Sequence, residues 1–74
     1  MAELWLTEAQ QRQIVRHALS DAPYECCGLI LGAEGRINGI IATKNIANDP
    51  TTQYRVDDAE VVKHHASIIG VYHS

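Results

Sequence analysis

The chain has 74 residues, of which 46% are hydrophobic and 20% charged, and its formal net charge is −3. This length allows one small domain, which buries only about 60% of the surface of its unfolded chain. The negative charge argues against nucleic acid or an anionic membrane as a partner, and no apolar run approaches the roughly 20 residues of a membrane span. The start, Met1–Leu4, lacks the basic residues of a secretory signal, so we expect a cytoplasmic protein.

The N-terminal part predicts a short strand followed by a helix. Glu3–Leu6 alternates as a strand does. Thr7 has the features of a helix N-cap, and Gln10 completes a capping box, which predicts a helix over residues 8–20. The apolar stripe predicted to face the core consists of Ile14, Val15, Ala18, Leu19 and Ala22. His17 lies at the flank of this stripe, where we expect a solvated side chain.

The chain is organised around the run from Pro23 to Gly32. Residues 26–31 carry no charged or strongly polar side chain, which predicts a strand buried on both faces. Glu25 stands at the entrance of that strand, where a carboxylate is costly unless a partner or a reaction uses it. Cys26 and Cys27 are adjacent and point to opposite faces, so they should neither bridge each other nor share a metal. We expect two buried hydrophobic residues, with a reactive thiol as the alternative.

The remainder predicts a hairpin, a further strand, a second helix and a last strand. A turn at 33–36 leads into an extended segment at 37–47, and a loop at 48–52 precedes a strand at 53–56. Asp57 is predicted to cap a helix at about 58–66, with Glu60 at its N3 position. A last strand at 68–72 leads to His73. On the second helix, the residues expected to face inward are Val61, Val62, His65 and Ala66. Successive histidines such as His64 and His65 point in different directions on a helix and make a poor metal pair. The fold class predicted is α/β (α+β), with a largely antiparallel mixed sheet flanked by helices.

Glu25 and His73 each lie at the end of an apolar strand. If the two strands are neighbours, both side chains can reach one site. A catalytic zinc ion needs three protein ligands and an open position, and a free carboxylate beside it can act as a general base. Residue types alone indicate such a site only weakly, and a small structural α/β domain stays open as an interpretation.

The run from Pro23 to Gly32 closely resembles the P-x-E-x-C-G-x-L-x-G motif of the JAMM (MPN, JAB-type) zinc metallopeptidase family, in its stand-alone prokaryotic branch. Asn45–Pro50 and Tyr54–Asp57 follow in the order of that family, and Ile69–Ser74 is similar to a segment that ends in the first half of its H-S-H-P motif. The resemblance implies a cytidine-deaminase-like MPN core that is incomplete at the C-terminus. Residues 1–74 would then be the N-terminal portion of a single JAMM/MPN domain.

The resemblance also implies a function and its residues. The family uses one catalytic Zn²⁺ ion and water bound to it to hydrolyse a peptide or isopeptide bond, often near the C-terminus of a ubiquitin-like or sulfur-carrier protein. Glu25 matches the general acid/base and His73 the first zinc ligand, and the other ligands are expected beyond Ser74. We therefore expect the 74-residue chain alone to be inactive.

A non-catalytic MPN-type scaffold that binds protein partners is the alternative function. The unpaired edge of the strand at 68–72 would favour association. The link from Asp57 to Ile68 is shorter than the family's second helix would require, which leaves the groove and the choice of substrate open. Neither nucleic acid nor a membrane is expected as a partner.

Overall fold

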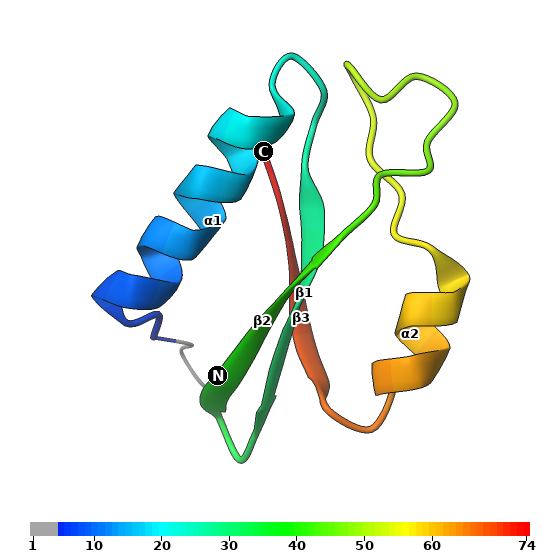
Figure 1. Cartoon of the computed structure of the whole chain (residues 1–74). Coiled ribbons are helices and arrows are strands. Elements are labelled where there is room, and N and C mark those ends of the chain that lie inside the picture. The colour runs from blue at the N-terminus through cyan, green and yellow to red at the C-terminus, as the bar shows by residue number, and fades with distance from the viewer. Residues whose placement is uncertain (1–4) are drawn as a thin grey trace.

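The structure, a computed structural model, describes residues 5–74 and contains two helices and one three-stranded sheet. The elements are α1 (Glu8–Asp21), β1 (Cys27–Ala33), β2 (Arg36–Thr43), α2 (Asp58–His64) and β3 (Ile68–His73). The strand order is β2-β1-β3, and both pairings are antiparallel. Figure 1 shows α1 on one side of the sheet and α2 on the other. The α+β class predicted from the sequence is confirmed, although the sheet formed by the described residues is wholly antiparallel rather than mixed.

Both helices begin where the sequence predicts. The Thr7 hydroxyl accepts a hydrogen bond from the Gln10 backbone N–H at 3.1 Å, and the Gln10 side chain accepts one from the Thr7 N–H at 2.9 Å. The predicted capping box is therefore present, and α1 ends within one residue of its expected end. The Asp57 carboxylate accepts from the N–H of Ala59 at 3.0 Å and caps α2, which ends two residues earlier than predicted.

The face that α1 turns to the sheet is narrower than its apolar pattern suggested. Ile14 and Ala18 pack against the core, as predicted. Val15 and Leu19 were also expected to face inward, but they are 56% and 74% exposed, and Ala22 is exposed as well. Since a three-stranded sheet offers room for little more than one i, i+4 row of a helix, residues one position further round face solvent.

The orientation of α2 differs from the prediction. The residues expected to face inward are all exposed: Val61, Val62, His65 and Ala66. The less exposed side of α2 carries instead Glu60 and His64, whose side chains approach to 3.6 Å as an i, i+4 pair. The Asp57 cap and the short link to β3 fix the rotation of this seven-residue helix, so the apolar pattern does not decide which side faces inward.

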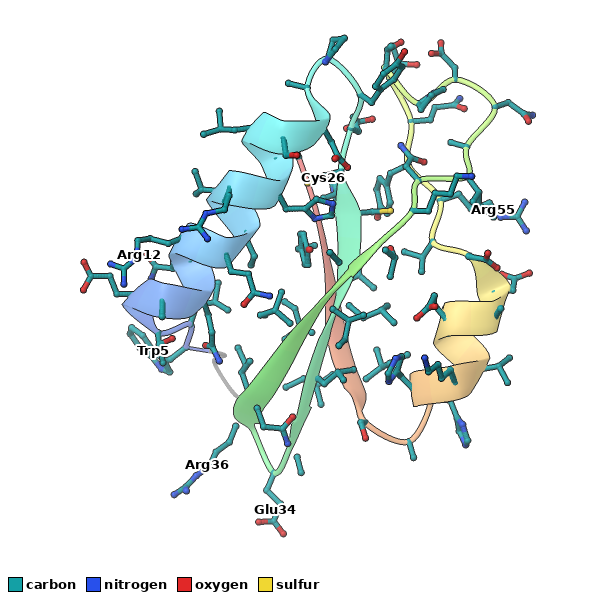
Figure 2. All side chains as sticks on the ribbon, in the orientation of Figure 1. Trp5, Arg12, Cys26, Glu34, Arg36 and Arg55 are labelled. Carbon is teal, nitrogen blue, oxygen red and sulfur yellow. The ribbon has the colours of Figure 1, made fainter. Side chains whose placement is uncertain are left out.

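The core lies on β1, as the sequence predicted. Residues 27–30 and Gly32 are buried, and both cysteines are free and fully buried. Cys26 and Ile30 pack with Tyr72 and other residues on the side of the sheet that α1 covers, and Figure 2 shows Cys26 between that helix and the strands. Successive side chains of a strand alternate between faces, so Cys27 points away from α1. The two cysteines therefore serve two different faces of the sheet.

Two of the predicted extended segments change in the structure. The segment predicted at 37–47 forms a strand only from Arg36 to Thr43, and the strand predicted at 53–56 is absent apart from a single bridge between Asn45 and Val56. The Asn45 side chain binds the backbone of this segment directly, at the Gln53 carbonyl and the Arg55 N–H. These groups are satisfied without a ladder, so a second strand is not required.

The predicted strand at Glu3–Leu6 lies partly outside the described residues. Trp5 and Leu6, which are described, belong to no strand, and Leu6 packs against the core. Among residues 5–74, no helix has both the length and the apolar character needed to cross a membrane. The described part of the chain thus reduces to a three-stranded sheet with one helix on each side.

Candidate functional site

The register of the sheet brings the two predicted site residues to the same end. Cys27 at the start of β1 pairs with His73 at the end of β3. The pairing extends one residue further, because the Ser74 N–H donates to the Cys26 carbonyl at 3.2 Å and the Cys26 N–H donates to the Ser74 hydroxyl at 3.0 Å. Glu25 is the next residue along. The two strands are therefore neighbours, which is the condition that the sequence set for a shared site.

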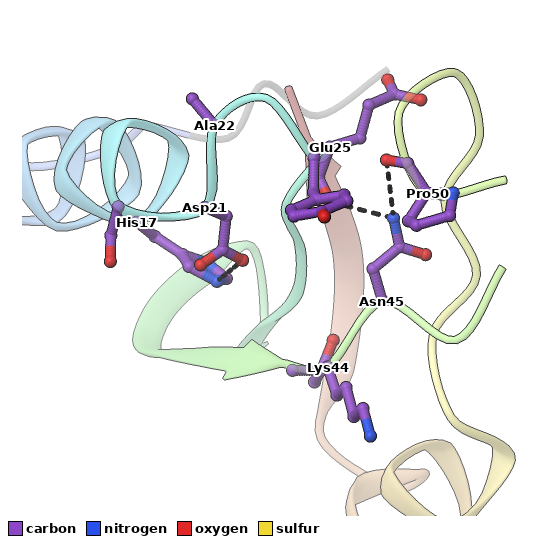
Figure 3. A pocket seen from close by; sticks show the side chains of 10 residues that line it. His17, Asp21, Ala22, Glu25, Lys44, Asn45 and Pro50 are labelled. Atoms are coloured by element: carbon purple, nitrogen blue, oxygen red, sulfur yellow. Dashed lines mark hydrogen bonds and ion pairs between the residues drawn. The ribbon is translucent and has the colours of Figure 1, made fainter.

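Glu25 is held by its backbone and leaves its carboxylate available. Its N–H donates to the Pro50 carbonyl at 2.6 Å, and its carbonyl accepts from the Asn45 amide at 2.9 Å. None of the ion pairs found within residues 5–74 involves Glu25. The half-buried residue lines an open cleft of about 630 Å³ between the C-terminal end of α1 and the segment after β2 (Figure 3). This arrangement suits a carboxylate that receives a proton.

His73 is exposed and has a defined ring orientation. Its imidazole stacks on the Tyr54 ring with centroids 4.1 Å apart and 13° between the planes. Its Nδ1 lies 3.1 Å from the backbone oxygen of Ser74, so in the neutral imidazole Nδ1 donates to that oxygen. The lone pair is then on Nε2. Metal-binding histidines commonly donate their other nitrogen in this way.

The donor chemistry of His73 fits a zinc ligand, but the described residues provide no complete set. Within residues 5–74, no group of three or more His, Cys, Asp or Glu side chains is placed to hold a metal ion. His64 pairs with Glu60, and the His65 Nδ1 lies 3.1 Å from the Val62 carbonyl of its own helix. These two histidines are therefore engaged locally on α2.

His17 is not solvated, contrary to the prediction. Its side chain is 15% exposed and bridges two partners. Nε2 lies 3.1 Å from the Asp21 carboxylate and Nδ1 2.7 Å from the Tyr72 hydroxyl. In the neutral imidazole, Nε2 donates to Asp21 and the Tyr72 hydroxyl donates to Nδ1. The ring of Tyr72 reaches His17 over the space left by Gly28, which has no side chain to block it. This contact joins residues 55 positions apart and has no signature in the local pattern.

The buried Tyr72 hydroxyl and Cys27 thiol stay protonated near neutral pH. Burial raises the pKa of Tyr72 to about 12. Burial also raises the pKa of the Cys27 thiol, against the opposing effect of its hydrogen bond with Thr43. Because the thiolate is the reactive form, a raised pKa and full burial argue against Cys27 as a nucleophile.

Two residues that were not predicted for the site, Asn45 and Tyr54, contact the two that were. Asn45 contacts the backbone of Glu25, and Tyr54 contacts the ring of His73. A signal for Asn45 was present, since its amide stands two residues after the end of β2 and opens the segment Asn45–Pro50. The stacking of Tyr54 on His73 depends on the tertiary fold.

Comparisons with known proteins bear on this geometry. A family model described as prokaryotic homologs of the JAB domain matches residues 7–74. Searches of curated proteins and of solved structures found no match. The matched region includes Glu25, the Cys27–Gly28 pair and His73.

Proposed function

The chain belongs to the family of prokaryotic homologues of the JAB domain, and on this basis we propose that it provides the general base and one metal ligand of a zinc-dependent metallopeptidase or isopeptidase. The observation that carries the proposal is the β1–β3 register, which sets His73 beside the strand that Glu25 enters. A free carboxylate and a histidine with an available Nε2 at one end of a sheet suit metal-assisted hydrolysis.

The metal would bind the Nε2 atom of His73, and we propose that its other ligands lie beyond Ser74. When bound, zinc lowers the pKa of a water molecule and polarises the carbonyl of the substrate. The Nδ1–H bond to the Ser74 backbone oxygen and the stacking on Tyr54 hold the imidazole in one orientation. Such support is characteristic of metal ligands, because it fixes both the tautomer and the ring plane.

Glu25 would move the proton. As the oxygen of the attacking water bonds to the carbonyl carbon, the Glu25 carboxylate accepts the proton of that water. The same carboxyl group then delivers the proton to the leaving nitrogen while the C–N bond breaks, so atoms and charge balance. The backbone of Glu25 is hydrogen-bonded at both its N–H and its carbonyl, so the position of the Cα atom that carries the carboxylate side chain is fixed.

We propose a protein or peptide substrate, cleaved near the C-terminus of a ubiquitin-like or sulfur-carrier protein. The open cleft beside Glu25 supports this choice, because an extended peptide can enter it from the surface. We further propose a cytoplasmic location, since both cysteines are free and disulfides are rare in that compartment.

The test compares Glu25→Gln with the wild type in the full product of the gene that encodes this chain. The substitution preserves shape but removes the proton acceptor, so zinc content should stay constant while turnover of a peptide with a Gly-Gly junction falls by about 10²–10⁴-fold. Glu34→Gln is the matched control, because Glu34 is exposed at the tip of the β1–β2 hairpin, far from the site (Figure 2). His73→Ala should lose the zinc.

Two outcomes would contradict the proposal. If Glu25→Gln turns over substrate as fast as Glu34→Gln does, Glu25 is not the general base. Wild-type protein that holds no zinc and cleaves no peptide, yet retains a protein partner, would favour the non-catalytic MPN-type binding module instead.

A further inference from the structure

Asn45 uses the full hydrogen-bonding capacity of its side chain on backbone groups. Its amide nitrogen donates to the Glu25 and Gln53 carbonyls at 2.9 Å each, and lies 3.5 Å from the Pro50 carbonyl. Its amide oxygen accepts from the N–H groups of Ala47 and Arg55 at 3.0 Å each. One partly buried side chain thus joins the entrance of β1, the loop after β2 and the segment 53–55. Figure 3 shows two of these contacts, to Glu25 and Pro50.

The segment that Asn45 holds carries the ring that stacks on His73. Asn45 binds the residue before Tyr54 and the residue after it, at the Gln53 carbonyl and the Arg55 N–H. Tyr54 is therefore fixed on both sides. Its ring lies parallel to the His73 imidazole within 13°, at a centroid distance of 4.1 Å.

We propose that Asn45 and Tyr54 are positioning residues of this site, through which the backbone of Glu25 and the ring of His73 are held relative to each other. The proposal rests on the function proposed above and adds residues that act through others. His73 is exposed at the end of a strand, and the Tyr54 stacking adds to the contact of its Nδ1 with the Ser74 backbone oxygen in limiting the rotation of its ring. A catalytic group and a metal ligand must be held within about 0.5 Å of their productive geometry. The Asn45–Tyr54 link joins a residue that precedes β1 to a residue at the end of β3.

A purely structural role for Asn45 makes a different prediction. Asn45 would then close the loop as Asp49 does, whose carboxylate accepts from Thr51 and Thr52. Loss of either residue would lower stability without altering the ring of His73. Asp49→Ser is therefore the matched control for Asn45→Ser, because both remove several loop hydrogen bonds but only Asn45 reaches Glu25 and the flanks of Tyr54.

The first readout is the NMR spectrum of the full gene product, without metal or substrate. A stacked aromatic ring shifts protons above its face upfield, so the His73 ring protons should be displaced upfield in the wild type. Tyr54→Phe should retain the displacement and Tyr54→Leu should abolish it. Asn45→Ser should reduce it, whereas Asp49→Ser should leave it unchanged. Tyr54 is 37% exposed, so its variants keep the test available even if Asn45→Ser fails to fold.

The second readout is kinetic, in the full gene product. Loss of a group that supports a metal ligand typically costs 10–100-fold in metal affinity or activity. Tyr54→Leu should therefore lower kcat by this factor, whereas Tyr54→Phe, which keeps an aromatic ring, should keep kcat near the wild-type value. If the His73 ring protons do not respond to Tyr54→Leu, the proposal is overturned, whether or not the protein cleaves peptides. If they respond as expected in a protein that binds no zinc, the positioning contact stands and the peptidase assignment fails.

Discussion

Gly28 is a position at which a single added methyl group should be strongly destabilising. A Cβ atom at Gly28 would overlap with the outer ring atoms Cε1, Cζ and Oη of Tyr72 on the neighbouring strand. Tyr72 is 8% exposed and its hydroxyl binds His17, so the ring has little room to move away. Gly28→Ala must therefore displace a buried aromatic ring and break its hydrogen bond.

The magnitude follows from those two losses. Overpacking a buried site costs about 1–3 kcal/mol, and a lost hydrogen bond about 0.5–1.5 kcal/mol. Replacing a strand glycine by alanine by itself raises the free energy of unfolding by about 0.5–1 kcal/mol, because glycine loses more conformational entropy on folding. The expected loss is therefore about 0.5–4 kcal/mol, with a central value of about 2 kcal/mol. A chain of 74 residues has a total stability of roughly 4–11 kcal/mol, so the loss is a substantial part of the whole.

Urea unfolding followed by far-UV circular dichroism measures this loss, with the slope m checked for constancy. Gly39→Ala is the matched control, because a Cβ there would meet only Leu31 atoms at ordinary contact distances of 3.8 and 3.9 Å. It should be neutral or slightly stabilising. Tyr72→Leu removes the atoms that collide with a Cβ at Gly28, so Gly28→Ala should cost little in that background. The resulting coupling free energy should be about 1–3 kcal/mol.

Either of two results would refute the reasoning. Equal losses for Gly28→Ala and Gly39→Ala would mean that the effect is one of backbone conformation. An equal loss for Gly28→Ala with and without Tyr72→Leu would mean that the two residues do not compete for space.

Three further predictions concern the cap, the buried phenol and the thiols. Thr7→Ala removes the capping box of α1 and should lower the free energy of unfolding by about 1 kcal/mol, measured in urea; an unchanged value would contradict the cap. The folded pKa of Tyr72, about 12, exceeds its ordinary value of 10.0, so its stabilising contribution is complete below pH 10 and is lost between pH 10 and 12. The difference in stability between the wild type and Tyr72→Phe should therefore shrink over that range, and a constant difference would count against a raised pKa. Both cysteines are fully buried, so a thiol reagent should label them only as the chain unfolds in urea; prompt labelling of Cys27 in native protein would contradict its environment.

The features predicted correctly from the sequence are those that local chemistry decides. The cap at Thr7 requires only Thr7 and Gln10. The apolar run after Glu25 forms a buried strand, because its side chains are stable only in the interior. The antiparallel hairpin follows from the short turn after Ala33. A shared site for Glu25 and His73 requires β1 and β3 to be adjacent strands, and the observed register fulfils this requirement.

The features predicted wrongly depend on the space that the fold leaves. Val15 and Leu19 continue an apolar pattern, but the sheet is too small to cover them. His17 is largely shielded from solvent because Tyr72 reaches across Gly28, a contact between distant parts of the chain. The strand predicted at 53–56 is absent because an asparagine side chain satisfies the backbone that a partner strand would have paired.

The strand order β2-β1-β3 has a consequence for the order of folding. β1 and β2 are joined by a two-residue turn, so their hairpin can close quickly. β3 must reach β1 across the whole segment from Ala33 to Ile68, and the entropy lost in closing a loop grows with its length. Long-range pairings of this kind form late. Glu25 enters β1 and His73 ends β3, so the local hairpin alone does not bring the two residues together, and they meet only when β3 pairs with β1.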